Sequence, residues 1–484
     1  MTIKGLSIHA HFYQPPREDP IIKVIPIEKS AYPFDNWNER IHAECYQPNA
    51  EIGNFEYISF DIGPTLMSWL STYKPQTYQM ILAQNKRTTS HFGVSNALAQ
   101  PYYHVILPLA TTTDKILQIT WGITDFAYRF GYSPLGMWLP ETAVDYETLL
   151  LLANQGIQYT ILAPWQADLN ELDITEPYKI KLPGGKAITV FFFQGELSGR
   201  ISFDPKTTSD ANHFIQNDLL TYYLKEKTNQ GEPQLVLVAT DGELYGHHQP
   251  HRERFLAQLL DGATSTAGLT MLYPALWLQS FPIKNEISIK EYTSWSCHHD
   301  LLRWKGECSC SSMGASWKYY LRVSLERLAA DLDWIFFDAT YPHISKPRRL
   351  RERYIHAMLG KISPDELIKE IAGHSLTTDQ RNRIYWLLEA QRERQRMFTS
   401  CGWFFDEFDR IEPLNNIASA AQAVWLTHLA TGDELAPQFI ADLSRVVSSQ
   451  TGLKGNQVFE QYYEKAKQFS MKYLPPAEAI QPRY

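Results

Sequence analysis

Two acidic residues are the strongest candidates for catalysis in this sequence. Glu141 follows the apolar run at residues 136–140, and Asp241 follows the apolar run at residues 235–240. An apolar run that ends at a carboxylate is typical of the C-terminal end of a buried barrel strand, where catalytic residues gather. Two carboxylates on different strand ends of one barrel are the smallest set of groups that can cleave a glycosidic bond.

A pair of histidines, His9 and His11, comes near the start of the chain. Alternate residues of a strand face one side, so the two imidazoles should point the same way. They could hold a metal ion, because His-x-His at a strand end is a familiar ligand pair. They could also bond substrate hydroxyls, or be core histidines with satisfied hydrogen bonds. The pattern by itself favours the core interpretation.

A group of cysteines and histidines follows near residue 300, namely Cys297, His298, His299, Cys308 and Cys310. A zinc site could be drawn from it, but the spacing lacks the paired Cys-x-x-Cys of structural zinc sites. We therefore expect buried thiols and no bound metal here, and no cofactor elsewhere. A disulfide of Cys308 with Cys310 or with Cys297 is an alternative that a reducing compartment disfavours.

Strand-like apolar runs alternate with helical patterns up to roughly residue 290. This alternation predicts an α/β fold with a parallel sheet, and the number of strands fits a barrel, closed or incomplete, better than an open sheet. No glycine-rich dinucleotide motif and no Walker loop is present, which weakens nucleotide-binding hypotheses. The expected strands are residues 5–12, 57–63, 136–140, 159–163, 188–193, 235–240 and 269–273, and the expected helices include residues 64–85, 114–130, 145–155 and 251–260.

Beyond roughly residue 310 the pattern is helical. Ser363 and Thr377 begin segments that look like helix N-caps. We expect a catalytic barrel at residues 1–300 and a C-terminal α-helical domain packed on it at residues 301–484. Amphipathic periodicity predicts helices over residues 313–337, 349–359, 379–398, 417–429 and 456–473.

The composition of the chain limits the classes of partner that it can bind. The net charge of −8 and the pI near 6.0 give no basic stripe for a nucleic acid. Aromatic residues make up 13% of the chain, which a large core explains, although Trp and Tyr also suit stacking on sugar rings. The five cysteines are scattered, and the chain starts with a strand and not with a signal-peptide pattern. No apolar run is long enough to span a bilayer. We therefore expect a soluble cytoplasmic protein without a membrane partner.

Several motifs, in order along the first 300 residues, resemble those of glycoside hydrolase family 57. They are His9-Ala-His11-Phe-Tyr-Gln14-Pro-Pro-Arg17, Trp138-Leu-Pro-Glu141 and Thr240-Asp-Gly-Glu-Leu-Tyr-Gly-His-His248. The resemblance is greatest to a less characterised branch that continues into a helical region of unknown function. Segments typical of that branch are Tyr103-His104-Val-Ile-Leu-Pro108, Trp295-Ser-Cys297-His298 and Phe398-Thr-Ser-Cys401-Gly-Trp403.

This resemblance implies an incomplete (β/α)7 barrel and a retaining mechanism, with Glu141 as nucleophile and Asp241 as general acid/base. Asp241 must then hold its proton near neutral pH, so burial or the Glu141 charge should raise its pKa. Together with the cleft-lining residues near residue 300, the expected substrate-binding set is His9, His11, Gln14, His104, Trp138, Glu243, His247, Trp295, His298, Arg303 and Trp304.

The sequence also departs from the family pattern. Phe12 and Tyr13 stand between His11 and the Gln-Pro that usually follows it directly. The second motif usually carries a Glu, whereas residues 93–100 contain no acid, so Asn96 or Gln100 would have to replace it. These differences bear on the sugar and the linkage more than on the type of reaction.

The leading hypothesis is a retaining enzyme that hydrolyses or transfers α-glucan, as an amylase, a 4-α-glucanotransferase or a branching enzyme does. One alternative is a metal-dependent polysaccharide deacetylase or zinc mannosidase on a related barrel, with His9 and His11 as ligands. That chemistry needs an Asp beside the histidines, and Asp19, the nearest one after the strand, is too far along the chain. A second alternative is a non-catalytic glycan-binding protein, which the intact Glu141 and Asp241 argue against.

Overall fold

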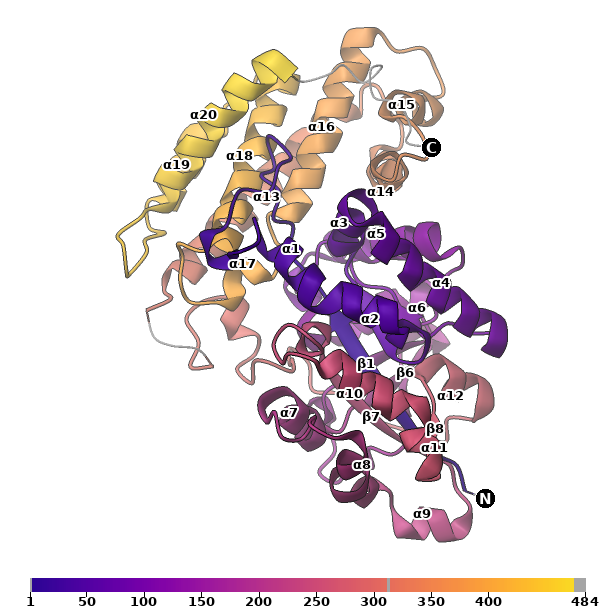
Figure 1. Ribbon diagram of the computed structural model, residues 1–484. Coiled ribbons are helices and arrows are strands. Elements are labelled where there is room, and N and C mark those ends of the chain that lie inside the picture. The colour runs from indigo at the N-terminus through magenta and orange to yellow at the C-terminus, as the bar shows by residue number, and fades with distance from the viewer. Residues whose placement is uncertain (1, 311–313, 474–484) are drawn as a thin grey trace. The chain divides into compact units, whose positions relative to one another are not determined.

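The computed structural model describes residues 2–310 and 314–473, and the chain divides into two compact units (Figure 1). The first unit comprises residues 1–14, 27–102 and 107–296, and the second comprises residues 15–26, 103–106 and 297–484. Two short segments from the N-terminal part therefore belong to the second unit. The division at residue 300 that we expected from the sequence did not include these two segments in the second unit.

The first unit is α/β, with two sheets. β1 lies between β2 and β7, also pairs with β8, and is parallel to all three, while β2 continues to β3. The second sheet has the order β4-β6-β5-β9. The strands are β1 (Lys4–Phe12), β2 (Ser59–Ile62), β3 (Ala97–Leu98), β4 (Tyr159–Leu162), β5 (Tyr178–Lys181), β6 (Ala187–Phe192), β7 (Gln234–Asp241), β8 (Thr270–Met271) and β9 (Asn285–Glu286).

Isolated bridges connect the two sheets. Ala99 pairs with Met137 and Gly136 pairs with Tyr159, both in the parallel sense, so the chain at 136–137 lies between β3 and β4. Side chains from both sheets also share one buried cluster, which includes Leu98 and Trp138 together with residues of β4, β6 and β7. The two sheets thus enclose a common core, although strand pairing in the described residues does not close them into a barrel.

Strands expected from the sequence are confirmed at β1, β2, β4, β6, β7 and β8. The strand expected at residues 136–140 is wrong, because this segment forms only the isolated bridges and then turns into the 3-10 helix η5 (Pro140–Thr142). Pro140 has no N–H for a ladder, and Glu141 and Thr142 have positive φ angles of 58° and 51° that end any extended run. Periodicity missed the short strands β3, β5 and β9.

Helices cover the strands of the first unit. The single helix expected at 64–85 is two helices, because Pro75 begins a new helix and disfavours a helical conformation for Lys74 before it. The helices are α1 (Trp37–Ile41), α2 (Gln47–Ile52), α3 (Pro64–Tyr73), α4 (Pro75–Phe92), α5 (Thr112–Phe130), α6 (Tyr146–Asn154), α7 (Gly195–Phe203), α8 (Ala211–His213), α9 (Lys225–Gln230), α10 (Arg252–Gln258), α11 (Thr264–Thr266) and α12 (Pro274–Ser280).

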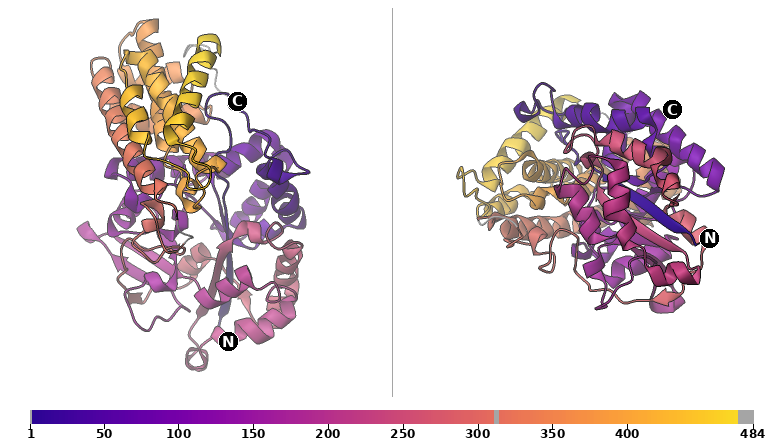
Figure 2. Two further views of the ribbon diagram at one scale, coloured as in Figure 1. Left: turned by 90° about the vertical axis from the view of Figure 1, so that its left-hand side faces the viewer. Right: turned by 60° about the horizontal axis from the view of Figure 1, so that its bottom comes forward.

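The second unit is helical, as the sequence predicted. Ser363 and Thr377 each cap a helix with a reciprocal capping box, which confirms both N-cap predictions. The long helices α13, α16, α18 and α20 pack together, and the left view of Figure 2 shows them aligned. The helices are α13 (Trp317–Thr340), α14 (Pro347–Met358), α15 (Pro364–Ala372), α16 (Thr378–Arg396), α17 (Cys401–Phe404), α18 (Ile411–Thr431), α19 (Ala436–Leu443) and α20 (Gly455–Tyr473). Met313, where we expected the first helix to begin, lies outside the described residues.

Candidate active site

The central strand β1 aligns the candidate groups. In the ladder, His11 is level with Asp61 of β2 on one side and with Asp241 of β7 on the other. Parallel strands place their C-terminal ends at one edge, so these side chains meet where β1, β2 and β7 end. Pairing of strands that lie far apart in sequence therefore builds the site.

A buried ion pair forms the floor of this site. The carboxylate of Asp61 accepts hydrogen bonds from His9 Nε2 at 3.0 Å and from His11 Nδ1 at 2.9 Å. Because an ionised carboxylate only accepts, the Asp61 bond assigns the proton of neutral His9 to Nε2, and Ser59 Oγ, 2.9 Å from His9 Nδ1, then donates to that nitrogen. His9 and His11 thus point the same way, as the alternation of the strand predicts, and both are buried.

Charge in this group is concentrated on His11 and Asp61. Burial opposes protonation of His11, but the charge of Asp61, with help from Asp241 and Glu243, raises the pKa of His11 to about 9. Burial lowers the pKa of His9 more than its bond to Asp61 raises it, so His9 is neutral. Burial works against the Asp61 carboxylate, yet His11 and the two hydrogen bonds hold its pKa below the usual range. These shifts favour a protonated His11 beside Asp241.

Glu141 projects from a turn with an unusual backbone. Its φ of 58° is in the left-handed region, which a non-glycine residue adopts at a cost of roughly 1–3 kcal/mol. Trp295 Nε1 donates to Glu141 Oε2 at 2.9 Å and Ser296 Oγ donates to the same oxygen at 2.7 Å. The Trp295 N–H also bonds the Glu141 carbonyl at 3.0 Å. One short segment, 295–296, therefore fixes both the backbone and the carboxylate of Glu141.

Asp241 is the last residue of β7. Solvent reaches its side chain, yet the surrounding protein desolvates the carboxyl and raises its pKa, while the charges of His11 and His248 oppose this rise. In the described part of the chain, no group donates a hydrogen bond to its carboxylate. Burial also raises the pKa of Glu141, the donors Ser296 and Trp295 lower it, and the charge of Asp241 raises it again. The two carboxylates thus interact electrostatically, and Glu141 has the better support for a negative charge.

Glu243 lies next to this pair in a protected position. Its Oε1 accepts from the Tyr46 hydroxyl at 2.6 Å and from the Tyr13 N–H at 3.2 Å. Burial raises its pKa to about 7, although the Tyr46 bond acts in the opposite direction. Gly242 allows the close turn, because a Cβ there would lie 2.3 Å from the ring of Phe12. Glu243 can therefore exchange a proton near neutral pH.

Aromatic rings surround the imidazoles. Trp138 is fully buried and stacks on His9 and His11, with ring centroids 4.8 and 5.0 Å away. The ring of Trp295 meets Trp138 edge-on at 5.1 Å and His11 at 6.1 Å. Gln14 hydrogen-bonds the Tyr46 hydroxyl that holds Glu243. These contacts place Trp138, Trp295 and Gln14 at the candidate site, with Trp138 as a packing support.

The missing acid of the second motif has a polar replacement. Gln100 donates to Asp61 and to the Phe12 carbonyl, the latter at 3.2 Å. Asn96, the other replacement considered from the sequence, donates to the carbonyls of Phe55 and Ile58 at 2.8 and 2.6 Å. Gln100 thus belongs to the site, whereas Asn96 ties the loop before β3 to the chain before β2.

Other residues expected at the site have different partners. His247 Nδ1 bonds the Glu44 carboxylate at 2.5 Å, within the first unit. His104, with a φ of 53°, bonds Ser400 Oγ at 2.7 Å within the second unit. His298, Arg303 and Trp304 also belong to the second unit. Arg303 donates to the carbonyls of Phe404 and Cys310, and Trp304 is fully buried, which favours structural roles for these two residues.

Three site residues were missed from the sequence. Asp61 stands in an ordinary apolar strand, and only its pairing with β1 brings it to His9 and His11. Ser296 and His248 each neighbour a residue that we had selected, Trp295 and His247, so their sequence position was a usable signal.

One group among the described residues that could hold a metal lies in the second unit. It comprises Cys297, His299, Cys308 and Cys310, which we had considered as a zinc site from the sequence.

Comparison with known proteins identifies the family. Residues 30–289 match the model of glycosyl hydrolase family 57, and the chain belongs to this family. Residues 315–481 match a domain of unknown function (DUF3536). The membership of this family that the motifs indicated is confirmed.

The relatives are distant in sequence. The chain is 23% identical over 275 residues to an α-amylase of Pyrococcus abyssi and 24% identical over 276 residues to a 4-α-glucanotransferase of Thermococcus litoralis. Each match covers 53% of this chain and 39% of the relative, so the chain spans well under half the length of these relatives.

The likeness in fold is more extensive. An exo-type maltose-forming amylase from Pyrococcus sp. ST04 superposes with a TM-score of 0.73 at 15% identity, over 98% of this chain and 93% of that one. A family 57-type branching enzyme from Pyrococcus horikoshii superposes with a TM-score of 0.61 at 16% identity, over 99% of this chain and 98% of that one. Both units of the chain therefore have counterparts in solved structures. Within the described residues, no helix combines the length and apolarity needed to cross a bilayer.

Proposed function

We propose that this protein is a retaining enzyme that cleaves α-glucan and passes the sugar to water or to another sugar. The observation that carries the proposal is Glu141, held by Trp295 and Ser296 and close enough to Asp241 at the end of β7 that the Asp241 charge raises its pKa. The relatives and structural neighbours include an amylase, a 4-α-glucanotransferase and a branching enzyme, which supports α-glucan as the substrate. We also infer that the two bridged sheets form an incomplete (β/α)7 barrel.

The division of labour follows from the hydrogen bonds. Glu141 carries two donors on one oxygen, which stabilise the ionised form that attacks the anomeric carbon. Asp241 is desolvated and without donors among the described residues, which favours the protonated form that a leaving oxygen needs. After the glycosyl ester forms on Glu141, the same Asp241 acts as base for water or a sugar hydroxyl.

Replacement of the nucleophile tests the proposal. Glu141→Gln keeps size and hydrogen bonding but cannot form a glycosyl ester, so turnover of maltooligosaccharides and glycogen should fall by several orders of magnitude with the fold intact. Glu147→Gln, a nearby exposed carboxylate that pairs with Lys115, is the matched control and should keep its activity. More than a few per cent of wild-type rate in Glu141→Gln would contradict the assignment.

Azide rescue tests Asp241. Asp241→Ala should lose activity most on substrates with poor leaving groups, because activated aryl and fluoride groups need no proton. Azide can then enter the space left by the carboxyl, restore turnover, and give an α-glycosyl azide after two inversions. A β-glycosyl azide from this variant, or an equal loss with every leaving group, would exclude the acid/base role.

The metal-dependent alternative gains one observation, because Asp61 lies beside His9 and His11, where a ligand Asp was missing from the sequence. However, His9 Nε2 and His11 Nδ1 already bond the carboxylate with which they would share the metal. A metal-activated water would not need Glu141. Substantial deacetylation or hydrolysis by Glu141→Gln, with loss of activity in His9→Ala, would favour this alternative.

A further inference from the structure

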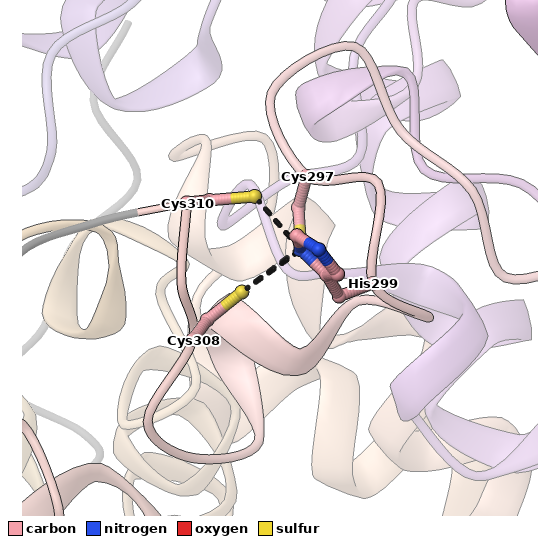
Figure 3. Close-up of side chains that lie close together, drawn as sticks. All are labelled: Cys297, His299, Cys308 and Cys310. Atoms are coloured by element: carbon pink, nitrogen blue, oxygen red, sulfur yellow. Dashed lines mark hydrogen bonds between the residues drawn. The ribbon is translucent and has the colours of Figure 1, made fainter.

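Four side chains of one short segment converge in the second unit. They come from Cys297, His299, Cys308 and Cys310, and their donor atoms all lie within 4.8 Å of one another (Figure 3). The Cys297 and Cys308 sulfurs are 3.7 Å apart. His299 Nδ1 lies 3.2 Å from the Cys310 sulfur and 3.5 Å from the Cys308 sulfur.

The sulfur–sulfur separation of 3.7 Å and the nitrogen–sulfur separations of 3.2 and 3.5 Å lie close to the edges of a zinc tetrahedron. Zinc–sulfur bonds of about 2.3 Å and zinc–nitrogen bonds of about 2.0–2.1 Å place sulfurs about 3.8 Å apart and sulfur about 3.5 Å from nitrogen. A disulfide would need a sulfur separation of about 2.05 Å. The distance of 3.7 Å between Cys297 and Cys308 therefore fits two ligands of one ion and not a covalent bond.

The surroundings suit a bound metal. Cys297 and Cys308 are buried, and His299 Nε2 lies 3.4 Å from Ser309 Oγ. A ligand histidine commonly donates its second N–H to such a partner, which fixes the ring and leaves Nδ1 free to coordinate. Arg303 donates a hydrogen bond to the backbone carbonyl of Cys310 at 3.0 Å, which fixes the backbone of the fourth ligand residue.

The segment has little regular secondary structure. Residues 297–310 contain a single turn of 3-10 helix, η12 (Leu302–Trp304), after a tight turn in which Asp300 and Leu301 have φ angles of 50° and 61°. A loop with so little regular secondary structure gains stability from a cross-link that joins its two ends. A metal held by Cys297 and His299 at one end and by Cys308 and Cys310 at the other is such a cross-link.

We propose that Cys297, His299, Cys308 and Cys310 bind one structural Zn²⁺ ion. The spacing Cys-x-His-x8-Cys-x-Cys is not the paired knuckle expected of zinc sites, which is why the sequence alone favoured buried thiols. Three thiolates and one imidazole are ligands that zinc accepts, and four protein ligands leave no open position for a reacting water. The ion is thus structural, and the proposal does not depend on the catalytic roles given above.

Metal analysis of the full-length protein tests this proposal. Protein purified without a metal-affinity step should contain a single zinc ion per chain by mass spectrometry of the elements. His299→Ala and Cys308→Ser should lose the bound zinc and melt at a lower temperature. His298→Ala and Cys401→Ser are matched controls from outside the donor set, and both should keep the metal.

A second measurement covers variants that fail to fold. In the wild-type protein, organomercurial titration of the thiols should release zinc to a colorimetric chelator, and protein made with Co²⁺ should show thiolate-to-cobalt absorption. Zinc-free protein with a Cys297–Cys308 disulfide, an iron–sulfur chromophore, or zinc that persists in His299→Ala and Cys308→Ser would each overturn the assignment.

Discussion

Glu141 depends on its neighbours at the scale of single residues. Trp295 Nε1 and Ser296 Oγ both donate to one oxygen of its carboxylate, Oε2, and its backbone carbonyl accepts from the Trp295 backbone N–H. Under the nucleophilic role proposed above, the other oxygen is the one that attacks, and the same bonds hold the left-handed turn in place. Trp295 is thereby a positioning residue in addition to any contact it makes with sugar.

Trp295→Phe isolates this role, because it keeps an aromatic ring and removes the indole N–H. Loss of a hydrogen bond to a charged group, worth about 1.5–3 kcal/mol, should lower kcat/KM roughly ten- to a hundredfold. The pKa of Glu141 should rise without this donor, so the acidic limb of the pH profile should move to higher pH.

The control is Trp165→Phe, whose indole donates to the Ser294 carbonyl at 2.9 Å and not to Glu141. It should leave the acidic limb in place. An unshifted limb in Trp295→Phe would show that this tryptophan does not support the charge of Glu141.

At the scale of elements, the pairing of β1 with β2 joins His11 to Asp61. His11 has a folded-state pKa of about 9, above its ordinary value of 6.5, so its contribution to stability is complete below pH 6.5 and is lost as the pH rises through about 9. The Asp61 pKa is lowered, so its contribution is present above its ordinary value and is lost only at acid pH.

Asp61→Asn should therefore destabilise the protein most between about pH 5 and 6.5, by roughly 3–5 kcal/mol, because it leaves a buried imidazole without its counter-charge. The difference in thermal midpoint between wild type and variant should shrink steadily from pH 6.5 to 9. A difference that stays constant over this range would mean that His11 is not protonated in the native protein.

Periodicity predicted the elements well where local sequence decides the conformation. The capping boxes at Ser363 and Thr377 and the buried strand β7 are examples, since their signals lie within a few residues. Asp61 could not be predicted, because only pairing between distant strands gives it its partners, and the choice between Gln100 and Asn96 as the replacement for the missing acid also needed the fold. Glu141 was found by its motif, although its strand was not, because Pro140 breaks the run.

Residues of the second unit show the same limit of prediction from sequence. His104 was expected near the substrate because of its position in a family motif, and Trp304 because it was expected to line a cleft near residue 300. In the structure His104 bonds Ser400 and Trp304 is fully buried. Sequence neighbours of site residues need not remain in the same unit of the fold. The zinc ligands were visible as residue types, but their convergence required the turn at Asp300 and Leu301.

At the scale of the whole molecule, the second unit is not simply the C-terminal part of the chain. Lys23 pairs with the buried Glu393 at 2.9 Å, and Asn415 donates to the Pro16 carbonyl at 3.2 Å. His104 bonds Ser400 in the same unit. Residues 15–26 and 103–106 therefore complete a unit whose remaining part begins at residue 297.

A fragment of residues 297–484 should consequently be less stable than the same unit in the full chain. It leaves the Glu393 carboxylate, which is buried, without Lys23, and it removes the partner of Ser400. Hydrogen exchange of α16 and α18 should be faster in the fragment. Equal protection of these helices in the fragment and in the full chain would show that the two inserted segments are dispensable.

The two inserted segments also affect how the protein is made. Lys23 leaves the ribosome 370 residues before Glu393, a delay of roughly 20–75 s at roughly 5–20 residues per second. During this interval residues 15–26 and 103–106 have no helices to join, so the second unit cannot finish folding until the chain is nearly complete. Translation speed and chaperones that shield early segments should therefore influence the yield of native enzyme more than they would for a chain whose units fold one after the other.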